Sequence, residues 1–326
     1  KKSLPAMLPF CAAMAGAGFA FVGWVPAYVL LMCTVVIIGM ASATYHPQAS
    51  KTVNFLSSDN NKAANMGIFS LGGNAGMAVG SILMAFLLTL PGGLHNTMYF
   101  VLPGLLVFGL MMKYMPEYKR VNLEHNLKVQ AAKKSGAVQK IPYGGLALVL
   151  FFIFMRSTIH TGLSTYLPLF FINFRNAEPA FASMLVSCFL LGGVAGTYVG
   201  AVLSDRLGAR RIILGSVLCS IPAIWLIANV THPAAVLAAV VLAGFSIIGS
   251  FATTTILAQT MLPNNVGMAA GLTIGFSVGM GGFGVTILGF LADNYGLPFV
   301  MNLMTVLPVI ATLTAFKIPV PPQMQK

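Results

Sequence analysis

A charged and a titratable side chain lie well inside one apolar stretch of this chain. Arg156 stands near the middle of a run that we predict to be helical over residues 143–173, and His160 and Ser164 follow it at intervals of four. Residues spaced by four share one face of an α-helix, so these three form a stripe, with Tyr166 close by. A guanidinium can hold an anionic group through two parallel hydrogen bonds, and an imidazole can exchange a proton near neutral pH. The stripe therefore predicts a substrate or proton pathway.

Both groups also have purely structural interpretations. Arg156 could bond to backbone carbonyls across a helix break, and His160 could be a neutral histidine with all its hydrogen bonds satisfied. A proton pathway along such apolar runs needs a titratable group within them. The acids do not supply one, so we expect His160, His46 or helices outside this sequence to carry the proton. The six acids all lie at the ends of apolar runs or in loops: Asp59, Glu117, Glu124, Glu178, Asp205 and Asp293.

Three more polar side chains on apolar runs belong to the predicted pathway. His46 stands just before Pro47, which must end or kink a helix, so His46 either caps that helix or takes part in gating or proton transfer. Ser70 and Asn74 are four residues apart on one helix face, where they could line a cavity or join two helices by hydrogen bonds.

The elements that position these side chains are runs long enough to cross a bilayer. Hydrophobic residues make up 57% of the chain and charged residues 7%, whereas soluble domains carry about a quarter charged residues. A hydrocarbon core of about 30 Å needs about 20 apolar residues of helix, and lipid offers no partner to a bare backbone. We predict an all-α membrane protein with ten spans, at residues 4–23, 25–45, 64–90, 93–114, 143–173, 180–203, 210–229, 233–257, 265–291 and 298–317.

The basic residues give these spans a direction. When the spans are threaded alternately up and down, all eighteen Lys and Arg except Arg156 and Arg175 fall on one side. Basic loops stay in the cytoplasm, so we expect this side, with the C-terminus, to be cytoplasmic. We therefore predict a multi-pass protein of a plasma membrane, of the bacterial inner-membrane type.

The sequence gives no sign of a cofactor, a metal or an enzyme. The spans contain no carboxylate pair, no metal-spaced His/Asp cluster and no nucleophile–base motif. The net charge of +12 is spread along short loops, where topology and contact with anionic lipid explain it better than nucleic acid does. The four cysteines lie inside apolar runs without metal-type spacing and are predicted to be packing residues: Cys11, Cys33, Cys188 and Cys219.

An internal repeat relates the two parts of the chain. A shift of 204 positions superimposes Asn60, Asn61, Gly67 and Gly80 on Asn264, Asn265, Gly271 and Gly284. The shift makes the third span equivalent to the ninth, as expected for two six-helix halves related by an axis along the membrane normal. The first half would then lack two helices, and we expect Lys1 not to be the natural start of the protein. The predicted parts are an incomplete N-terminal half-bundle (residues 1–114), a cytoplasmic linker (115–142), a six-helix bundle (143–318) and a cytoplasmic tail (319–326).

Glycines recur at every fourth position in three spans. This spacing bares one helix face and lets a neighbouring backbone approach closely. The stripes could be ordinary tight packing or faces that slide between two transport states. They are Gly76 and Gly80; Gly192, Gly196 and Gly200; and Gly271, Gly275 and Gly279.

The loop between the sixth and seventh spans carries the most specific motif. Gly200 to Arg211 resembles the cytoplasmic signature of the major facilitator superfamily, Gly-x-Leu-Ala-Asp-Arg-x-Gly-Arg-Arg. In that family the cluster acts as a latch that must break before the protein opens inward; the alternative is a basic loop with one solvated acid. A carboxylate here could attract arginine side chains or a helix N-terminus. The matching residues are Asp205, Arg206, Gly208, Arg210 and Arg211.

Further segments resemble the fosmidomycin-resistance-type exporters of this superfamily. They are residues 39–50, with a His-Pro pair, residues 68–76, with a Gly-Gly-Asn run, and residues 262–271. The resemblance implies a major facilitator fold, with ten of its twelve helices present. It also implies a drug or metabolite antiporter driven by protons, of the kind that confers antibiotic resistance.

We therefore expect a secondary active transporter that exports a small organic compound by proton antiport with alternating access. Proton-coupled uptake of an organic anion is the close alternative, and an intramembrane enzyme, a channel or a membrane scaffold would each be a different class. The repeat and the latch motif argue against a channel or scaffold. The expected partners are a small-molecule substrate, protons and the lipid bilayer, and we expect a monomer.

Overall fold

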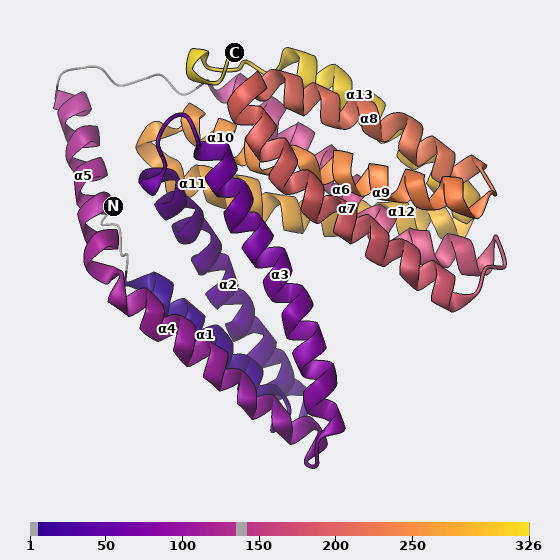
Figure 1. The fold of residues 1–326 in the computed structure, drawn as a ribbon, viewed down its shortest axis with the longest axis horizontal. Coiled ribbons are helices and arrows are strands. Elements are labelled where there is room, and N and C mark those ends of the chain that lie inside the picture. Colours follow the sequence, from indigo (N-terminus) through magenta and orange to yellow (C-terminus); the bar gives the residue numbers. More distant parts are fainter. Residues whose placement is uncertain (1–5, 135–141, 326) are drawn as a thin grey trace. The chain divides into compact units, whose positions relative to one another are not determined.

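Helices make up nearly all of the described part of the chain. The computed structural model describes residues 6–134 and 142–325 (Figure 1). In chain order the elements are α1 (Met7–Val22), α2 (Tyr28–Leu56), α3 (Lys62–Thr89), η1 (Gly93–Phe100), α4 (Val101–Lys113), α5 (Met115–Lys134), α6 (Tyr143–Asn173), α7 (Pro179–Leu207), α8 (Ala209–Asn229), α9 (Pro233–Gly249), α10 (Phe251–Met261), η2 (Pro263–Asn265), α11 (Val266–Ala270), η3 (Gly271–Gly275), α12 (Phe276–Tyr295), α13 (Leu297–Lys317) and η4 (Pro322–Met324).

Each of the ten predicted spans coincides with helix over most of its described residues. Eight helical stretches are long and apolar enough to cross a membrane: Tyr28–Leu56, Gly93–Lys113, Tyr143–Asn173, Pro179–Leu207, Ala209–Asn229, Pro233–Met261, Pro263–Tyr295 and Leu297–Lys317. The other two predicted spans fall on α1, a shorter apolar helix of 16 residues, and on α3, of 28 residues.

Two helices differ from what the sequence predicts. α2 does not end at Pro47 but continues to Leu56, so His46 lies in a helix interior and is not a cap. Prolines are tolerated inside membrane helices because neighbouring groups satisfy the freed backbone. Part of the predicted linker is the helix α5, where Arg120 pairs with Glu117 at 2.5 Å and with Glu124 at 3.8 Å. Such pairs, three or four residues apart, support a polar helix.

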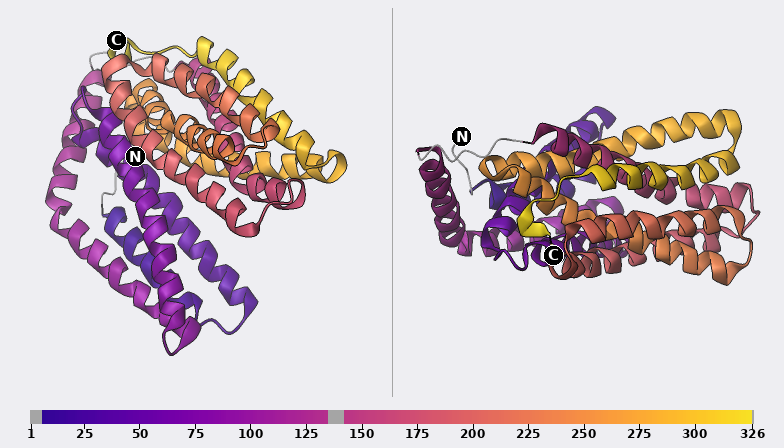
Figure 2. Two further views of the ribbon diagram at one scale, coloured as in Figure 1. Left: turned by 45° about the vertical axis from the view of Figure 1, so that its right-hand side comes forward. Right: turned by 90° about the horizontal axis from the view of Figure 1, so that it is seen from above.

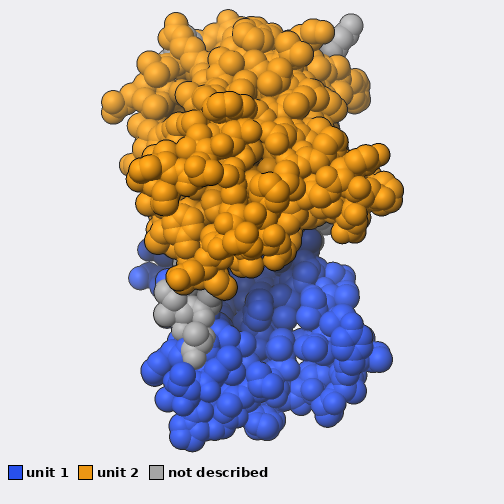
Figure 3. Space-filling model, turned by 90° about the vertical axis from the view of Figure 1, so that its right-hand side faces the viewer, with its two compact units in different colours: residues 1–57, 72–140 blue, residues 58–71, 141–326 orange. Residues whose placement is uncertain are grey.

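The chain forms two compact units (Figure 3). Unit 1 comprises Lys1–Ser57 and Gly72–Lys140, and unit 2 comprises Ser58–Leu71 and Ile141–Lys326. Within unit 2, helices α6 to α13 run side by side as a bundle (Figure 2). The first turns of α3 also belong to this unit. The finer division of the chain, into half-bundles, linker and tail, stays a prediction.

α6 is the central helix of unit 2 and packs against α7, α12 and α13. Side chains of α6 belong to two separate buried apolar clusters. One includes Leu163 with Phe189 and Met304, and the other includes Phe152 with Leu257. Because the second cluster reaches Met155 on α6 and the first begins at Ile159, residues 156–158 form a polar layer between them.

The glycine stripe of α7 is a site of tight packing. A Cβ atom built on Gly192, Gly196 or Gly200 would stand 2.4, 2.0 or 2.1 Å from a backbone carbonyl oxygen of α9, closer than any real contact. Gly244 of α9 is equally close to the backbone of α7. Helix association in lipid depends on such packing, because lipid tails are as apolar as leucine. At this stripe, therefore, the packing interpretation is confirmed.

The other two stripes differ from this one. No described heavy atom lies within 4 Å of a Cβ built on Gly76, Gly80, Gly275 or Gly279. At these four glycines, the described residues provide no close backbone partner of the kind that α9 gives to α7. A sliding role for them stays a prediction.

We expect Gly196→Val to force α7 and α9 apart. Overpacking typically costs about 1–3 kcal/mol, and here the added atoms meet backbone rather than a flexible side chain. Thermal unfolding in detergent should show a clearly lower midpoint. Gly215→Val on α8 is the matched control, since its Cβ would meet no described atom within 4 Å. Equal melting of the two variants would contradict the packing assignment.

Candidate functional site

Arg156 lies in the polar layer of α6 and is 4% exposed. Its Nη1 donates to Thr254 Oγ1 and its Nη2 to Ser277 Oγ, each at 3.5 Å, the outer limit of a hydrogen bond. Its Cζ lies 5.0 Å from the centre of the Phe251 ring, a cation–π distance. None of the ion pairs among the described residues involves Arg156. The guanidinium is thus buried with weak partners.

The partners of Arg156 stand where two spans depart from regular helix. Phe251 and Thr254 follow directly on the break at Ser250 that separates α9 from α10. Ser277 follows the single π-helical turn η3. Sharp bends favour Gly/Ser pairs, such as Gly249 and Ser250 here, and π-turns are frequent at functional sites. The local irregularities therefore bring hydroxyl groups to one buried cation.

Other hydroxyl groups crowd the same layer. The Ser157 and Ser277 hydroxyls are 2.5 Å apart, so one donates to the other across α6 and α12. α12 approaches α6 so closely that a Cβ on Gly284 would stand 2.1 Å from Thr158 Oγ1. Thr158 Oγ1, like the side-chain oxygens of Ser250 and Thr253, is buried without a hydrogen-bond partner in the described structure. Such orphan groups cost about 1–3 kcal/mol each and mark places where water or a ligand can supply a partner.

His160 lies one turn from Arg156 and is half-buried. Its ring contacts that of Phe189 on α7, with centres 5.6 Å apart. The rest of the predicted stripe has structural partners. Ser164 donates to the His160 carbonyl oxygen at 2.9 Å, and Tyr166 donates to the Val285 carbonyl oxygen at 2.9 Å, joining α6 to α12.

The remaining predicted pathway residues lie in other parts of the chain. His46 on α2 and Asn74 on α3 belong to unit 1, whereas Arg156 belongs to unit 2. The His46 ring touches Tyr45 edge-on, with centres 5.7 Å apart. Ser70 belongs to unit 2 and donates to the Met66 carbonyl oxygen of its own helix at 3.0 Å.

The signature loop makes a specific contact with α3 inside unit 2. The Asp205 carboxylate accepts hydrogen bonds from the backbone N–H groups of Ala63, at 3.2 Å, and Ala64, at 2.7 Å. These belong to the first turn of α3, whose N–H groups have no partner within the helix. The structure therefore contains the attraction to a helix N-terminus that the sequence allowed.

The other signature residues shape and fasten the turn. Gly208 has φ of +90°, a conformation that glycine adopts at little cost, and it joins α7 to α8. Arg210 donates to the Phe316 carbonyl oxygen near the end of α13, and Arg211 to the Leu207 carbonyl oxygen at 3.2 Å. Arg206 is exposed.

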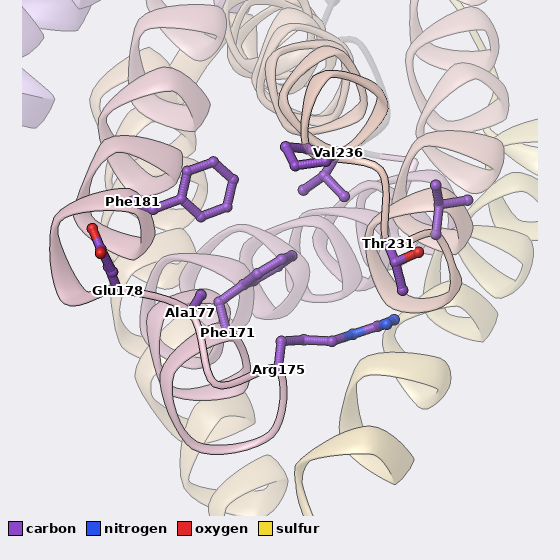
Figure 4. Close-up of a pocket in the computed structure, with 9 residues that line it drawn as sticks. Phe171, Arg175, Ala177, Glu178, Phe181, Thr231 and Val236 are labelled. Carbon is purple, nitrogen blue, oxygen red and sulfur yellow. The ribbon is translucent and has the colours of Figure 1, made fainter.

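A pocket of about 400 Å³ opens at the far end of α6, where Phe171 and Phe181 face each other near Val236 (Figure 4). Arg175 lies along its edge, donates to the Ala228 carbonyl oxygen at 2.8 Å, and sits 5.4 Å from the Phe170 ring centre. Arg175 is the one loop cation that the threading of the spans puts opposite to the other basic loop residues. It thus donates to a carbonyl group at the C-terminal end of α8.

Sequence reasoning found Arg156 but not its partners. These partners lie more than ninety positions from Arg156, in runs that look uniformly apolar or hydroxyl-rich: Phe251, Thr254 and Ser277. The Gly249–Ser250 pair and the glycine-rich start of the ninth span were the available signals, since both favour irregular helix.

Known proteins with similar sequence and structure agree with this architecture. The family model described as Major Facilitator Superfamily matches residues 4–176 and 149–326. The chain is 28% identical over 323 residues to YfnC of Bacillus subtilis, an uncharacterised MFS-type transporter, covering 98% of this chain and 78% of that protein. It is 26% identical over 321 residues to the fosmidomycin resistance protein of Escherichia coli, covering 97% and 77%.

Among solved structures, the fold is similar to that of the proton:xylose symporter XylE, with a TM-score of 0.75 and 12% identity over 98% of this chain and 81% of that one. The resemblance to fosmidomycin-resistance-type proteins and the predicted all-helical membrane fold are both confirmed. With its helical bundle, its signature turn and a family model that matches nearly its whole length, this chain belongs to the major facilitator superfamily of membrane transporters.

Proposed function

We propose that the protein exports a small organic compound bearing an acidic group across a bacterial inner membrane, in exchange for protons. The observation that carries the proposal is the buried guanidinium of Arg156. A charged side chain at this depth costs several kcal/mol, and two 3.5 Å hydrogen bonds and one ring offset only part of that. A bound anion would offset the rest through charge-assisted, bidentate contacts.

The hydroxyl groups around Arg156 suit the same ligand. Thr254 donates its own proton to the Ser250 carbonyl oxygen at 2.9 Å, which leaves its oxygen free to accept from Arg156. The Ser157–Ser277 pair can reorient, because either hydroxyl can be the donor. An acidic group entering this layer would therefore meet a cation and several adjustable donors.

Export is favoured by the relative named for fosmidomycin resistance. Proton-coupled uptake uses the same residues, and the imposed pH gradient separates the two directions in proteoliposomes. Antiport predicts that substrate accumulates in the compartment from which protons leave. Symport predicts that substrate and protons enter the same compartment.

We expect Arg156→Ala to abolish binding of acidic substrates. Arg156→Lys keeps the charge but loses the planar fork, so it should weaken binding by about tenfold. Binding can be measured with fosmidomycin and with a panel of organic acids and their neutral amides. Arg175→Lys, the same exchange in the pocket at the end of α6, should leave affinity unchanged. Wild-type affinity in Arg156→Ala would show that the residue is structural and would sink the proposed anion site.

We expect His160→Gln to flatten the dependence of transport on pH, because His160 is the titratable group one turn from Arg156. Glutamine keeps hydrogen-bonding atoms but cannot titrate, so folding should be retained. Initial transport rates over a pH series provide the measurement. His232→Gln, at the exposed start of α9, is the control. A pH profile that is unchanged in His160→Gln would exclude this histidine as the proton carrier.

We expect Asp205→Asn to weaken docking of α3 on the signature turn and to favour the inward-open state. The amide lacks the charge that attracts the helix N-terminus, which is worth about 0.3–2 kcal/mol. Labelling of cysteines introduced at the cytoplasmic mouth should increase. Asp59→Asn is the control, since the Asp59 side chain is 88% exposed and its 2.7 Å pair with Lys62 contributes little. Identical labelling in both variants would count against the latch.

A further inference from the structure

The segment that follows α13 packs on the end of unit 2. Ile318 is 1% exposed and Val320 is 7% exposed, and both belong to the buried apolar cluster that contains Met261 of α10. Met324, in the short 3₁₀ turn η4, packs against the same cluster. Residues 318–325 therefore have a defined place at the end of the bundle where α10 ends.

Prolines keep this segment extended. Pro319, Pro321 and Pro322 follow α13 closely, and a residue before proline is biased away from helical backbone. Ile318 has φ of −66° and ψ of 121°, and Pro321 has φ of −59° and ψ of 148°, both extended. Because proline has a fixed φ, the segment loses little conformational entropy when it packs. It leaves α13 and crosses the end of the bundle toward the turn between α7 and α8 (Figure 1, Figure 2).

The segment crosses the first turn of α6 at a glycine. A Cβ atom built on Gly145 would stand 2.5 Å from Pro319 Cγ, so the proline ring occupies the space that any larger side chain would need. No described heavy atom lies within 4 Å of a Cβ built on the neighbouring Gly144. Glycine weakens a helix relative to alanine, and at position 145 the close approach of Pro319 accounts for it.

The same segment contacts the signature turn. Arg210, at the start of α8, donates to the carbonyl oxygen of Phe316, just before the segment begins. A cavity of about 300 Å³ is lined by Arg210 and Arg211 from the turn and by Met324 and Gln325 from the segment. Residues 318–325 therefore lie between the start of α6 and the signature turn.

We infer that residues 318–325 form a strap that positions the signature turn. The strap ties the start of α8 to the start of α6 and to the end of α10, on the side that the basic loops predict to be cytoplasmic. Asp205 in that turn accepts hydrogen bonds from the Ala63 and Ala64 amides of α3. The strap thus also holds the carboxylate in place for the first turn of α3. The inference does not depend on the substrate or on the direction of transport.

Hydrogen–deuterium exchange of the whole chain in detergent micelles tests the strap. Val320→Asp places a charge at a buried position and should release it, whereas Pro322→Asp places the same side chain at an exposed position and is the control. In Val320→Asp, exchange at residues 205–213 and 62–66 should rise about tenfold, since burial of one valine contributes about that factor. Peptides around Arg175, at the far end of α6, should keep wild-type rates.

A second pair of variants loosens the strap from the other side. Gly145→Ala directs a methyl group at Pro319, whereas Gly144→Ala meets no described atom within 4 Å. Alanine favours helix at both positions, so both variants should fold. Gly145→Ala should raise exchange at the signature turn, and Gly144→Ala should leave it at the wild-type rate.

Wild-type exchange at the signature turn in both Val320→Asp and Gly145→Ala would overturn the inference. An increase confined to residues 318–325 would also overturn it, because the segment would then position nothing, and so would a uniform increase over all peptides of Gly145→Ala. Asp205→Asn should raise exchange at the start of α3 and leave residues 318–325 protected. A failure of the latch is therefore distinguishable from a failure of the strap.

Discussion

A peptide backbone inside hydrocarbon must satisfy its own hydrogen bonds, and this constraint decides most of what the chain can be. It makes every span a helix and confines irregular backbone to places that protein covers. The break at Ser250 and the π-turn Gly271–Gly275 are such places, and both lie beside Arg156. Regular helix provides the scaffold. The break at Ser250 and the π-turn bring the hydroxyl groups of Thr254 and Ser277 to Arg156. The proposed site thus lies where the constraint is locally relaxed.

The same solvent removes the usual reason for helices to associate, so close packing must replace the hydrophobic effect. Unit 2 uses two solutions. α7 and α9 meet backbone to backbone through glycines, whereas α6 and α12 meet through glycines on one side and hydroxyl-bearing residues on the other. In the first seam, backbone packs directly on backbone. The second, around Ser157, Thr158 and Ser277, contains hydroxyl groups, of which Thr158 Oγ1 has no hydrogen-bond partner in the described structure.

Sequence patterns were sufficient for the spans because length and hydropathy act locally; α6, for example, has the predicted ends, residues 143 and 173. They failed at the end of α2, which continues past Pro47 to Leu56, because neighbouring groups can satisfy the backbone that a proline frees. They identified Arg156 because a charged side chain inside an apolar span is costly in free energy. They did not identify Thr254 or Ser277, because these partners are brought to Arg156 only by the packing of α10 and α12 on α6. Serine and threonine are common in apolar runs, and their spacing does not predict which helix they will pack against.

The contact between Asp205 and the first turn of α3 has a kinetic consequence. Interactions of a carboxylate with a helix N-terminus are worth about 0.3–2 kcal/mol, which corresponds to a population ratio of about two- to thirtyfold. Such a contact biases an equilibrium without arresting it. A carrier must pass through each of its conformations once in every cycle. A contact that stabilised one conformation by much more than about 2 kcal/mol would therefore limit turnover. If this contact is the proposed latch, the modest strength of one carboxylate on two amide groups would let it break and re-form in every cycle.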